Sequence, residues 1–378
     1  MSGSRFLIVE ERAALPLHRQ VHVSGINAYR SCPRRWYWTD EHMGLGFEPR
    51  ERPDWIVLGS LVHRALELYY LTGTPLSDAL DIAVGEDWDR YGPSMLEEEK
   101  QNHSRLCLVA KRLLSNYHSW LARSGADDDL DFIHTEVTFH IPLEEYDIVV
   151  AGTWDGLVVR RSTGGLYIME HKTTRNVPRA VHGITWDVQP YIYAWAAEKV
   201  FDRPVHGVIY NIISTADPYD IPLLRNGMPS RAVRSTVQTT LQAYRETIIR
   251  CAGELGIPEE SALELYAAEL EYLSQAGDSM FFHREEMLVS KRVVESTFHQ
   301  FVTEAHNMLE TARRARDGVL PMPYKDRYKC PNCPARDACL AADEGADYME
   351  ILESTMKRRN GEGECTSVES LRMRLPLL

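Results

Sequence analysis

Long apolar segments are absent from this chain of 378 residues. No run of 18 apolar residues occurs, and the first residues lack the basic-then-apolar order of a secretory signal. These absences argue against a membrane-spanning segment and a membrane partner. We therefore expect a soluble, intracellular protein located in the cytoplasm.

Positive charge is also scarce, because 42 Lys and Arg residues face 55 Asp and Glu residues, for a net charge of −13. Such a balance argues against a uniformly basic nucleic-acid-binding surface. Local clusters at Arg34-Arg35 and at residues 313–316 can still line a channel while acids cover the rest of the surface. For any single cluster, a solvated helix face is the favoured interpretation.

Cysteine is the third scarce residue, with seven in the chain. In a reducing compartment, metal or cluster ligation is a better explanation for cysteines than disulfides. Cys330, Cys333 and Cys339 form a CxxCx5C pattern. Three thiols gain nothing from such close spacing as packing residues, whereas a metal ion or cluster needs convergent thiolates. Isolated cysteines are interpreted as core or incidental residues: Cys107, Cys251 and Cys365.

Acidic residues and a lysine mark the centre of the chain. Asp155 follows an apolar run, a turn is expected at residues 162–165, and a second apolar run ends in Glu170-His171-Lys172. Because side chains alternate along a strand, Glu170 and Lys172 share one side, and Asp155 can lie opposite them. Two carboxylates make a hard-oxygen site for Mg²⁺ or Mn²⁺, and the lysine can orient an attacking water or stabilise charge on a phosphate.

This spacing, followed by the QxxxY element Gln189 to Tyr193, resembles the PD-(D/E)xK nuclease superfamily. The QxxxY branch includes the nuclease domains of RecB and AddB and the CRISPR-adaptation exonucleases with an iron–sulfur cluster. The resemblance implies catalytic roles for five residues: Asp155, Glu170, Lys172, Gln189 and Tyr193.

The resemblance also implies two sites for inorganic cofactors. Its GxxxH pattern assigns His63 to the divalent metal site beside Asp155 and Glu170. Its cysteine arrangement adds Cys32, which lies 298 positions (330 − 32) before Cys330, to the CxxCx5C group, and the four hold a [4Fe-4S] cluster. A Cys₄ zinc site with the same connectivity remains an alternative.

Candidate DNA contacts surround these motifs. Arg175 leaves the second strand well placed for phosphates, and Arg34 and Arg35 near the cluster extend that contact along the backbone. Residues 36–38 are aromatic and can stack on unpaired bases, although core packing is the favoured interpretation for each of them. Glu136 suits either a metal site or a solvated strand position.

The expected fold class is α/β, with a mixed central sheet flanked by helices, helical insertions and an iron–sulfur staple between the N- and C-terminal parts. Strands are expected at 133–141, from 148 into Asp155, up to Lys172 and at 205–213, and helices at 185–201 and 291–317. The expected division is an N-terminal segment at 1–58, a nuclease core at 59–215 with a helical insertion at about 75–124, a helical region at 216–320 broken at 256–258, a cluster segment at 321–345 and a tail at 346–378.

The predicted function is a metal-dependent DNA exonuclease acting on single-stranded ends, in recombination and repair, phage or CRISPR-adaptation context. No helicase motif is visible, so a motor or another recombination or adaptation protein would be a separate partner. The alternatives are an endonuclease of the same fold, a catalytically silent DNA-end-binding scaffold subunit, and a zinc-stapled regulatory protein. An intact lysine at position 172 argues against a silent subunit.

Overall fold

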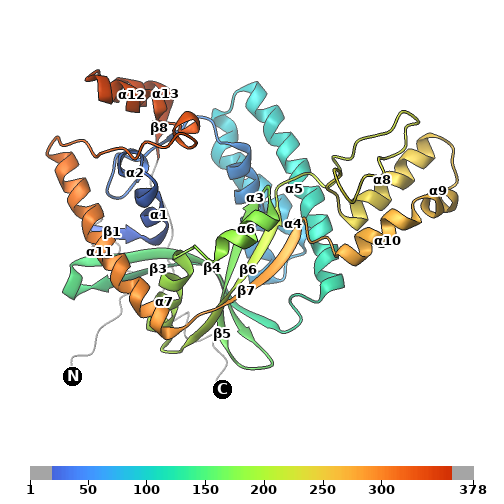
Figure 1. Cartoon of the computed structure of the whole chain (residues 1–378), viewed down its shortest axis with the longest axis horizontal. Coiled ribbons are helices and arrows are strands. Elements are labelled where there is room, and N and C mark those ends of the chain that lie inside the picture. Colours follow the sequence, from blue (N-terminus) through green and yellow to red (C-terminus); the bar gives the residue numbers. More distant parts are fainter. Residues whose placement is uncertain (1–18, 360–378) are drawn as a thin grey trace.

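The computed structural model describes residues 19–359. Its centre is a six-stranded sheet of order β1-β4-β5-β6-β7, with β3 paired to β4 (Figure 1). Two pairs, β1 with β4 and β5 with β6, are parallel, and the others are antiparallel. The expected mixed sheet is therefore confirmed. The strands are β1 Gln20–His22, β3 Leu130–Leu143, β4 Ile148–Arg160, β5 Leu166–Thr174, β6 Val205–Ser214 and β7 Phe282–Leu288, and β2 Phe47–Pro49 pairs separately with β8 Met356–Arg358.

Strand β4 has a divided edge at Asp155. β3 pairs along the whole of one edge, from Ile148 to Arg160. On the other edge, β1 pairs with residues 149–151 and β5 pairs with residues 156–159. Asp155 therefore lies between two pairings, where the sheet can admit side chains and a ligand.

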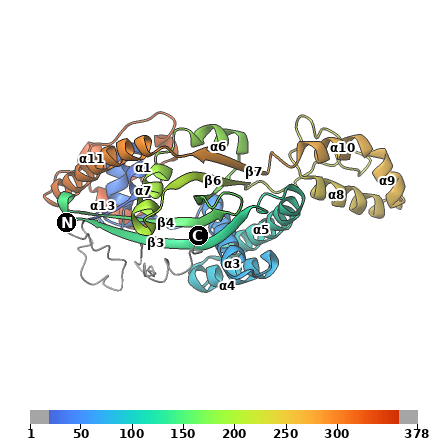
Figure 2. The ribbon, with the colours of Figure 1, turned by 90° about the horizontal axis from the view of Figure 1, so that it is seen from below.

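Helices cover both sides of the sheet. Figure 2 shows α1, α7 and α11 on one side, whereas α3, α4 and α5 lie on the other side toward one end. The helices are α1 Val23–Ser31, α2 Pro33–Thr39, α3 Asp54–Thr72, α4 Leu76–Tyr91, α5 Glu97–Ser124, α6 Val177–Ile184, α7 Gln189–Phe201, α8 Leu241–Glu254, α9 Glu259–Leu265, α10 Ala267–Ala276, α11 Lys291–Arg316, α12 Arg336–Glu344 and α13 Tyr348–Thr355, with short 3₁₀ turns at Gly92–Ser94, Glu144–Tyr146 and Cys330–Asn332.

The main core lies between the sheet and the α7–α11 pair. Trp195 of α7 stacks on Phe298 of α11 with 4.2 Å between ring centroids, and both side chains are buried. Aromatic pairs of this kind add about 0.5–1.5 kcal/mol to the free energy of burial. This packing fixes α7, and with it Gln189 and Tyr193, against the sheet.

Local chemistry sets where α7 begins. The sequence predicts a helix from residue 185, but α7 begins at Gln189. Asp187 Oδ1 accepts a hydrogen bond from the Gln189 amide at 3.1 Å, and Pro190 suits the first helical turn because it has no N–H to satisfy. The preceding residues form a turn that becomes part of the site described below.

Two groups of helices are added to the core that surrounds the sheet. The expected insertion near 75–124 is α4 and α5, which pack with α3 around a core of their own. Residues 221–273 build a separate small core under α8–α10, and Figure 1 shows these helices projecting to one side. This segment, called the appendage below, is inserted between β6 and β7. The expected break at 256–258 is confirmed by the gap between α8 and α9.

Some residues differ from the sequence-based division. Residues 282–316, expected within the helical region, add β7 to the sheet and place α11 beside α7. Residues 348–358, expected within the tail, form α13 and β8. Cys365 lies outside the described residues. Within residues 19–359, no helix is both long and apolar enough to cross a membrane.

Candidate metal centre

Three side chains from three elements converge at the divided edge of β4. His63 comes from the middle of α3, Glu136 from β3 and Asp155 from β4. His63 Nδ1 lies 3.8 Å from Glu136 Oε1 and 3.8 Å from Asp155 Oδ2. One ligand atom from each residue lies within 4.8 Å of the others, the one such group of three found in residues 19–359.

Glu136 has an unusual backbone for a strand residue. Its φ is 47°, in the left-handed region that costs a non-glycine residue about 1–2 kcal/mol. The pairings of Thr135 with Gly156 and of Val137 with Trp154 place Glu136 opposite Asp155. Strain of this kind is typical of functional sites.

The sequence underestimated Glu136. A solvated strand position was the favoured interpretation, but the structure places the carboxylate in the cluster. The reason is a register shift between Phe132 and His134, which a period-2 pattern cannot reveal. The available signal was a carboxylate in a strand expected next to the Asp155 strand.

Glu170 and Lys172 lie on the adjacent strand, β5. Pairing of Gly156 with Met169 puts Glu170 opposite Asp155, and the His171 amide donates to Asp155 Oδ2 at 2.7 Å. Lys172 Nζ is 3.4 Å from Glu170 Oε1, which confirms the predicted sharing of one side. Glu170, which was expected to hold the metal with His63 and Asp155, is not part of the group formed by His63, Glu136 and Asp155.

Asp187 is a residue that the sequence analysis missed. Its Oδ2 is 3.2 Å from Lys172 Nζ, while its Oδ1 accepts the Gln189 amide. One carboxylate therefore fixes both the lysine and the start of α7. An acid two positions before Gln189 was the only sign of it in the sequence.

The protonation equilibria of the cluster show an excess of negative charge. Burial raises the pKa of Asp155, and burial and the nearby Asp155 raise that of Glu170. For His63, burial lowers the pKa, but Glu136 and Asp155 outweigh it and raise the pKa to about 9. Crowded, partly desolvated carboxylates are stabilised by any cation among them, and a metal ion would displace the proton on His63.

Gln189 and Tyr193 face this cluster from α7. Gln189 Nε2 donates a hydrogen bond to Tyr193 Oη at 2.8 Å, which confirms that the two side chains share one side of the helix. Burial, with the charges of Glu170 and Asp155, raises the pKa of Tyr193 well above its usual value. The phenol therefore stays protonated beside the two carboxylates.

A family model for the PD-(D/E)XK nuclease superfamily matches residues 20–340. The chain belongs to the PD-(D/E)XK nuclease superfamily. Among curated proteins, no relative matches the chain. Membership in this superfamily implies a nuclease that hydrolyses phosphodiester bonds with divalent metal ions and binds DNA.

The donor set fits the divalent metal that the superfamily uses. Two carboxylates, Glu136 and Asp155, supply hard oxygen ligands, and the imidazole of His63 favours Mn²⁺ more than Mg²⁺. Glu170 lies across from Asp155 and completes the acidic surroundings. The two acids and the lysine of the superfamily pattern are thus grouped with two further residues, His63 and Glu136.

Replacing Glu136 with glutamine should weaken Mn²⁺ binding by at least about 10-fold, because an anionic ligand becomes neutral while its size is kept. Isothermal titration calorimetry measures the affinity without requiring turnover. Glu144→Gln, an exposed acid in the turn that follows β3, is the matched control and should bind Mn²⁺ normally. Unchanged affinity in Glu136→Gln would remove Glu136 from the site.

A buried polar network contacts β5 on the side of the sheet opposite to Glu170 and Lys172. His171 Nδ1 lies 2.9 Å from Asn211 Nδ2, and the imidazole stacks on Tyr70. Tyr70 Oη donates to Asp127, and Arg284 Nη2 donates to the same carboxylate at 2.6 Å. Burial lowers the pKa of His171, so the ring is neutral. The network holds the β5 backbone in place at the site.

Of the four expected cluster cysteines, Cys32 lies between α1 and α2, Cys330 and Cys333 lie before α12, and Cys339 lies within α12. Burial raises the pKa of the Cys333 thiol, and the nearby Cys32 and Cys330 raise it further. Cys330 Sγ accepts a hydrogen bond from the Asp326 amide at 3.2 Å. The chain thus brings Cys32 near the CxxC pair, although no three of the cysteine sulfurs form a group within 4.8 Å in the described part of the chain.

Arg34 does not have the role expected of it. The side chain is buried and donates to Pro321 O at 2.9 Å, to Asp343 Oδ1 at 2.7 Å and to Cys339 Sγ at 3.4 Å. A guanidinium engaged in this way has no free face for DNA. The expected DNA contact at Arg34 is therefore corrected to a structural tie between α2 and the cysteine segment.

The other residues expected to contact DNA differ in how exposed they are. Trp36 and Trp38 are each 1% exposed and Tyr37 is buried, so these rings pack in the core instead of stacking on bases. Arg35 is half-buried, and its charge opposes the rise in the pKa of Cys333. Arg175, in contrast, is exposed at the end of β5.

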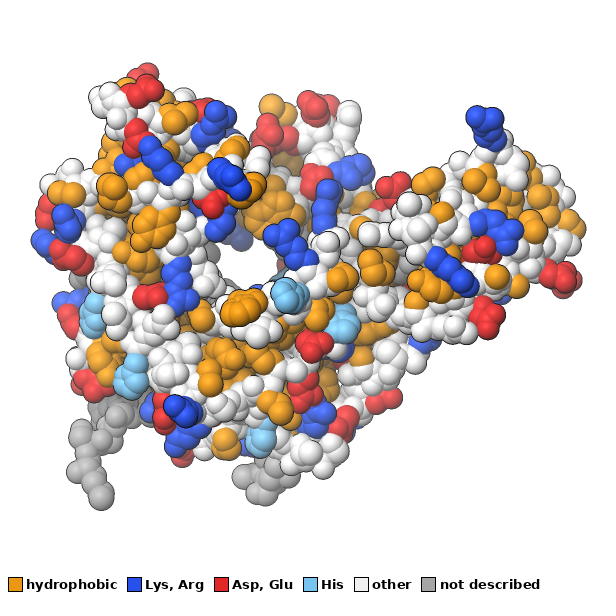
Figure 3. Space-filling view, in the orientation of Figure 1, with side chains coloured by type: hydrophobic (Ala, Val, Ile, Leu, Met, Phe, Trp, Pro, Cys, Tyr) orange, Lys and Arg blue, Asp and Glu red, His pale blue; other side chains and the backbone are white. Residues whose placement is uncertain are grey.

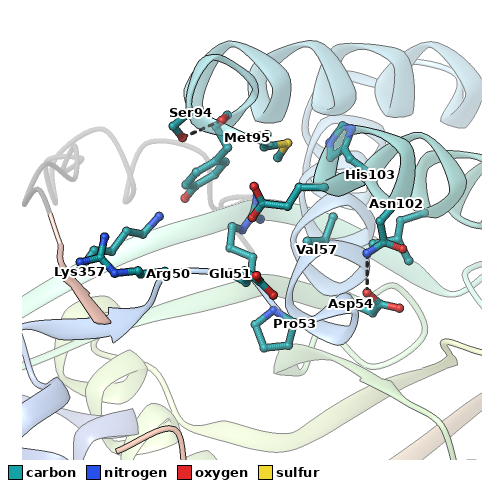
Figure 4. A pocket seen from close by; sticks show the side chains of 14 residues that line it. Arg50, Glu51, Pro53, Asp54, Val57, Ser94, Met95, Asn102, His103 and Lys357 are labelled. Carbon is teal, nitrogen blue, oxygen red and sulfur yellow. Dashed lines mark hydrogen bonds between the residues drawn. The ribbon is translucent and has the colours of Figure 1, made fainter. Parts of the chain in front are cut away.

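A cavity of about 300 Å³ lies at the N-terminal end of α3 (Figure 4). The cations around it are already engaged, because Arg52 pairs with Asp87 at 2.8 Å and Lys357 with Glu48 at 3.7 Å. Arg50 Nε donates to a backbone carbonyl of α13 at 3.0 Å. We therefore assign this cavity to the junction between β8 and the α3–α5 group, and not to catalysis.

Proposed function

We propose that the protein is an exonuclease that hydrolyses phosphodiester bonds at the ends of single-stranded DNA, with a [4Fe-4S] cluster joining the two ends of its chain. The observation that carries the catalytic part is the placement of Lys172 between Glu170 and Asp187, across the divided β4 edge from His63, Glu136 and Asp155. A metal centre facing a fixed ammonium group suits phosphodiester hydrolysis, because both can stabilise the negative charge that develops on the phosphate.

Each residue contributes through its charge and position. The divalent ion supplies Lewis-acid stabilisation of charge on the phosphate. Lys172, held by two carboxylates, donates to the scissile phosphate or to the attacking water. Gln189 and Tyr193 donate from α7 toward the nucleotide and keep their mutual hydrogen bond at 2.8 Å. Because these donors are fixed before substrate arrives, little reorganisation is needed in the reaction.

The shape of the molecule favours a single strand as substrate. Figure 3 shows an opening through the molecule between the α1–α2 part and the α3–α5 part, with Lys and Arg side chains on its rim. Local cations of this kind can bind a phosphate backbone despite the net charge of −13. An opening through which a strand can be threaded suits a substrate with a free end.

Four thiols support the cluster assignment. Cys32 and Cys330 lie near enough to raise the pKa of the Cys333 thiol, whose rise comes mainly from burial, and Cys339 Sγ accepts a hydrogen bond from Arg34 at 3.4 Å. N–H groups directed at cysteine sulfurs are a usual feature of iron–sulfur sites. With a cluster of this kind, the protein is similar to the AddB-type and CRISPR-adaptation nucleases. Recombination and repair, a phage or CRISPR adaptation is the proposed context, with a separate helicase or adaptation protein as partner.

The proposed end requirement predicts that a linear single strand is degraded with Mn²⁺, whereas a closed circle of the same sequence is not. The two substrates offer the same backbone, so only the free end differs. Gel electrophoresis of end-labelled and internally labelled DNA measures both rates, with metal-free reactions as the control. Equally fast loss of the circle would make the protein an endonuclease.

A further inference from the structure

One exposed face, starting at the end of β5, combines cationic side chains with an aromatic ring. Four exposed residues follow at intervals of four, three and four positions: Arg175, Arg179, His182 and Trp186. Residues three or four apart lie on the same side of a helix. Arg179 and His182 lie on α6, which spans Val177–Ile184, whereas Arg175 precedes the extended N-cap residue Asn176 and Trp186 follows the helix in a turn. These four exposed side chains are called the α6 ridge below.

The cations of the α6 ridge are available to a ligand. Among residues 19–359, neither Arg175 nor Arg179 takes part in a salt bridge. Arg175 is close enough to Asp54 to help lower the pKa of that carboxyl group. Asp54, however, is already hydrogen-bonded to Asn102 and paired with Arg105. Guanidinium groups without a carboxylate partner are suited to phosphate contacts.

Trp186 is the most exposed large apolar side chain among the described residues, at 77%. Its backbone is nonetheless fixed, because its amide donates to Gly183 O at 3.1 Å and the next amide donates to Ile184 O at 3.0 Å. The following residue is Asp187, whose carboxylate holds Lys172 at 3.2 Å. The indole is thus exposed to water at a defined place one residue from the groups that hold the catalytic lysine.

We propose that Trp186 is a stacking subsite for an unpaired base of the DNA strand, next to the scissile phosphate, and that Arg175 and Arg179 bind the phosphates that flank it. This inference rests on the proposed function. Every base has a π face, so such a subsite accepts any sequence. A base inside a duplex has both faces covered by its neighbours, so the subsite favours single strands.

The contribution of Trp186 is tested by steady-state cleavage of linear single-stranded DNA with Mn²⁺. Trp186→Ala should raise KM about 10-fold or more, with kcat changed much less, because stacking binds the strand but takes no part in bond cleavage. Trp186→Phe should keep most of the affinity. Trp186→Leu, which is apolar but cannot stack, should resemble the alanine variant. These substitutions are at an exposed position, so folding is not at risk.

A second substrate locates the base. A strand with an abasic position at the nucleotide beside the scissile bond should raise KM for the wild-type enzyme, but should cause no further rise with Trp186→Ala. Normal KM in Trp186→Ala, or equal effects of Leu and Phe, would overturn the stacking subsite. If the wild-type enzyme itself fails to cleave the linear strand, the proposed function fails, and that outcome is distinct.

Binding is then measured without cleavage, by fluorescence anisotropy with labelled single-stranded DNA. If the double variant Trp186→Ala/Lys172→Ala binds the DNA as tightly as Lys172→Ala, the stacking subsite is rejected.

Discussion

Replacing Lys172 with alanine should lower turnover by about 10²-fold or more and leave the protein folded. The ammonium group lies 3.4 Å from Glu170 and 3.2 Å from Asp187, so its position is fixed before substrate binds. Its loss removes a preorganised positive charge at the place where negative charge develops on the phosphate. Initial rates on linear single-stranded DNA with saturating Mn²⁺ measure the effect.

Two controls separate chemistry from structure in this variant. Circular dichroism should be unchanged, because Lys172 is partly exposed and contributes little to the core. Asp187→Asn should give a smaller loss, since the amide can still accept the Gln189 hydrogen bond but no longer holds the lysine by charge. Near-normal turnover in Lys172→Ala would exclude the proposed role of the lysine.

The second large effect should be seen on replacing Cys32 with alanine, which we expect to yield an insoluble or strongly destabilised protein. A cluster that links Cys32 to Cys330 closes a loop of 298 positions (330 − 32). A cross-link over a loop of this size stabilises a fold by roughly 5 kcal/mol through chain entropy, which is comparable to the whole stability of many domains. Soluble yield and denaturant unfolding of anaerobically purified protein measure the loss.

Metal analysis identifies what the thiols bind. Wild-type protein prepared without oxygen should contain about four irons per chain and absorb broadly near about 400 nm. Cys107→Ala, which changes a half-buried cysteine away from the cluster, should keep its iron and its solubility. Stoichiometric zinc without iron in the wild-type protein would show that the site is a zinc site.

Sequence reasoning located strands β3 to β6 and the residues on them, because alternation and apolar runs report directly on burial, but it did not predict β1 or β7. It predicted Asp155, Glu170 and Lys172 on adjacent strands, and the structure brings them together. It missed Asp187 and underestimated Glu136. Both depend on irregular backbone, a turn before α7 and a shifted register in β3, which no periodicity encodes.

Arg34 shows the opposite error. Two adjacent arginines in an acidic chain favoured a DNA contact, yet Arg34 is buried against three partners more than 280 positions away in sequence. Only the tertiary structure shows which charged side chains have found an internal partner. Local patterns therefore predicted the elements better than they predicted which cations remain free.

The appendage leaves and re-enters the sheet at neighbouring positions. β6 and β7 are antiparallel, and Ile213, near the end of β6, pairs with Phe282, at the start of β7. A short hairpin turn in place of helices α8–α10 would join the same two strands. The whole of α8–α10 is therefore an elaboration of one turn, and its length can change without altering the register of the strands that carry the proposed catalytic residues.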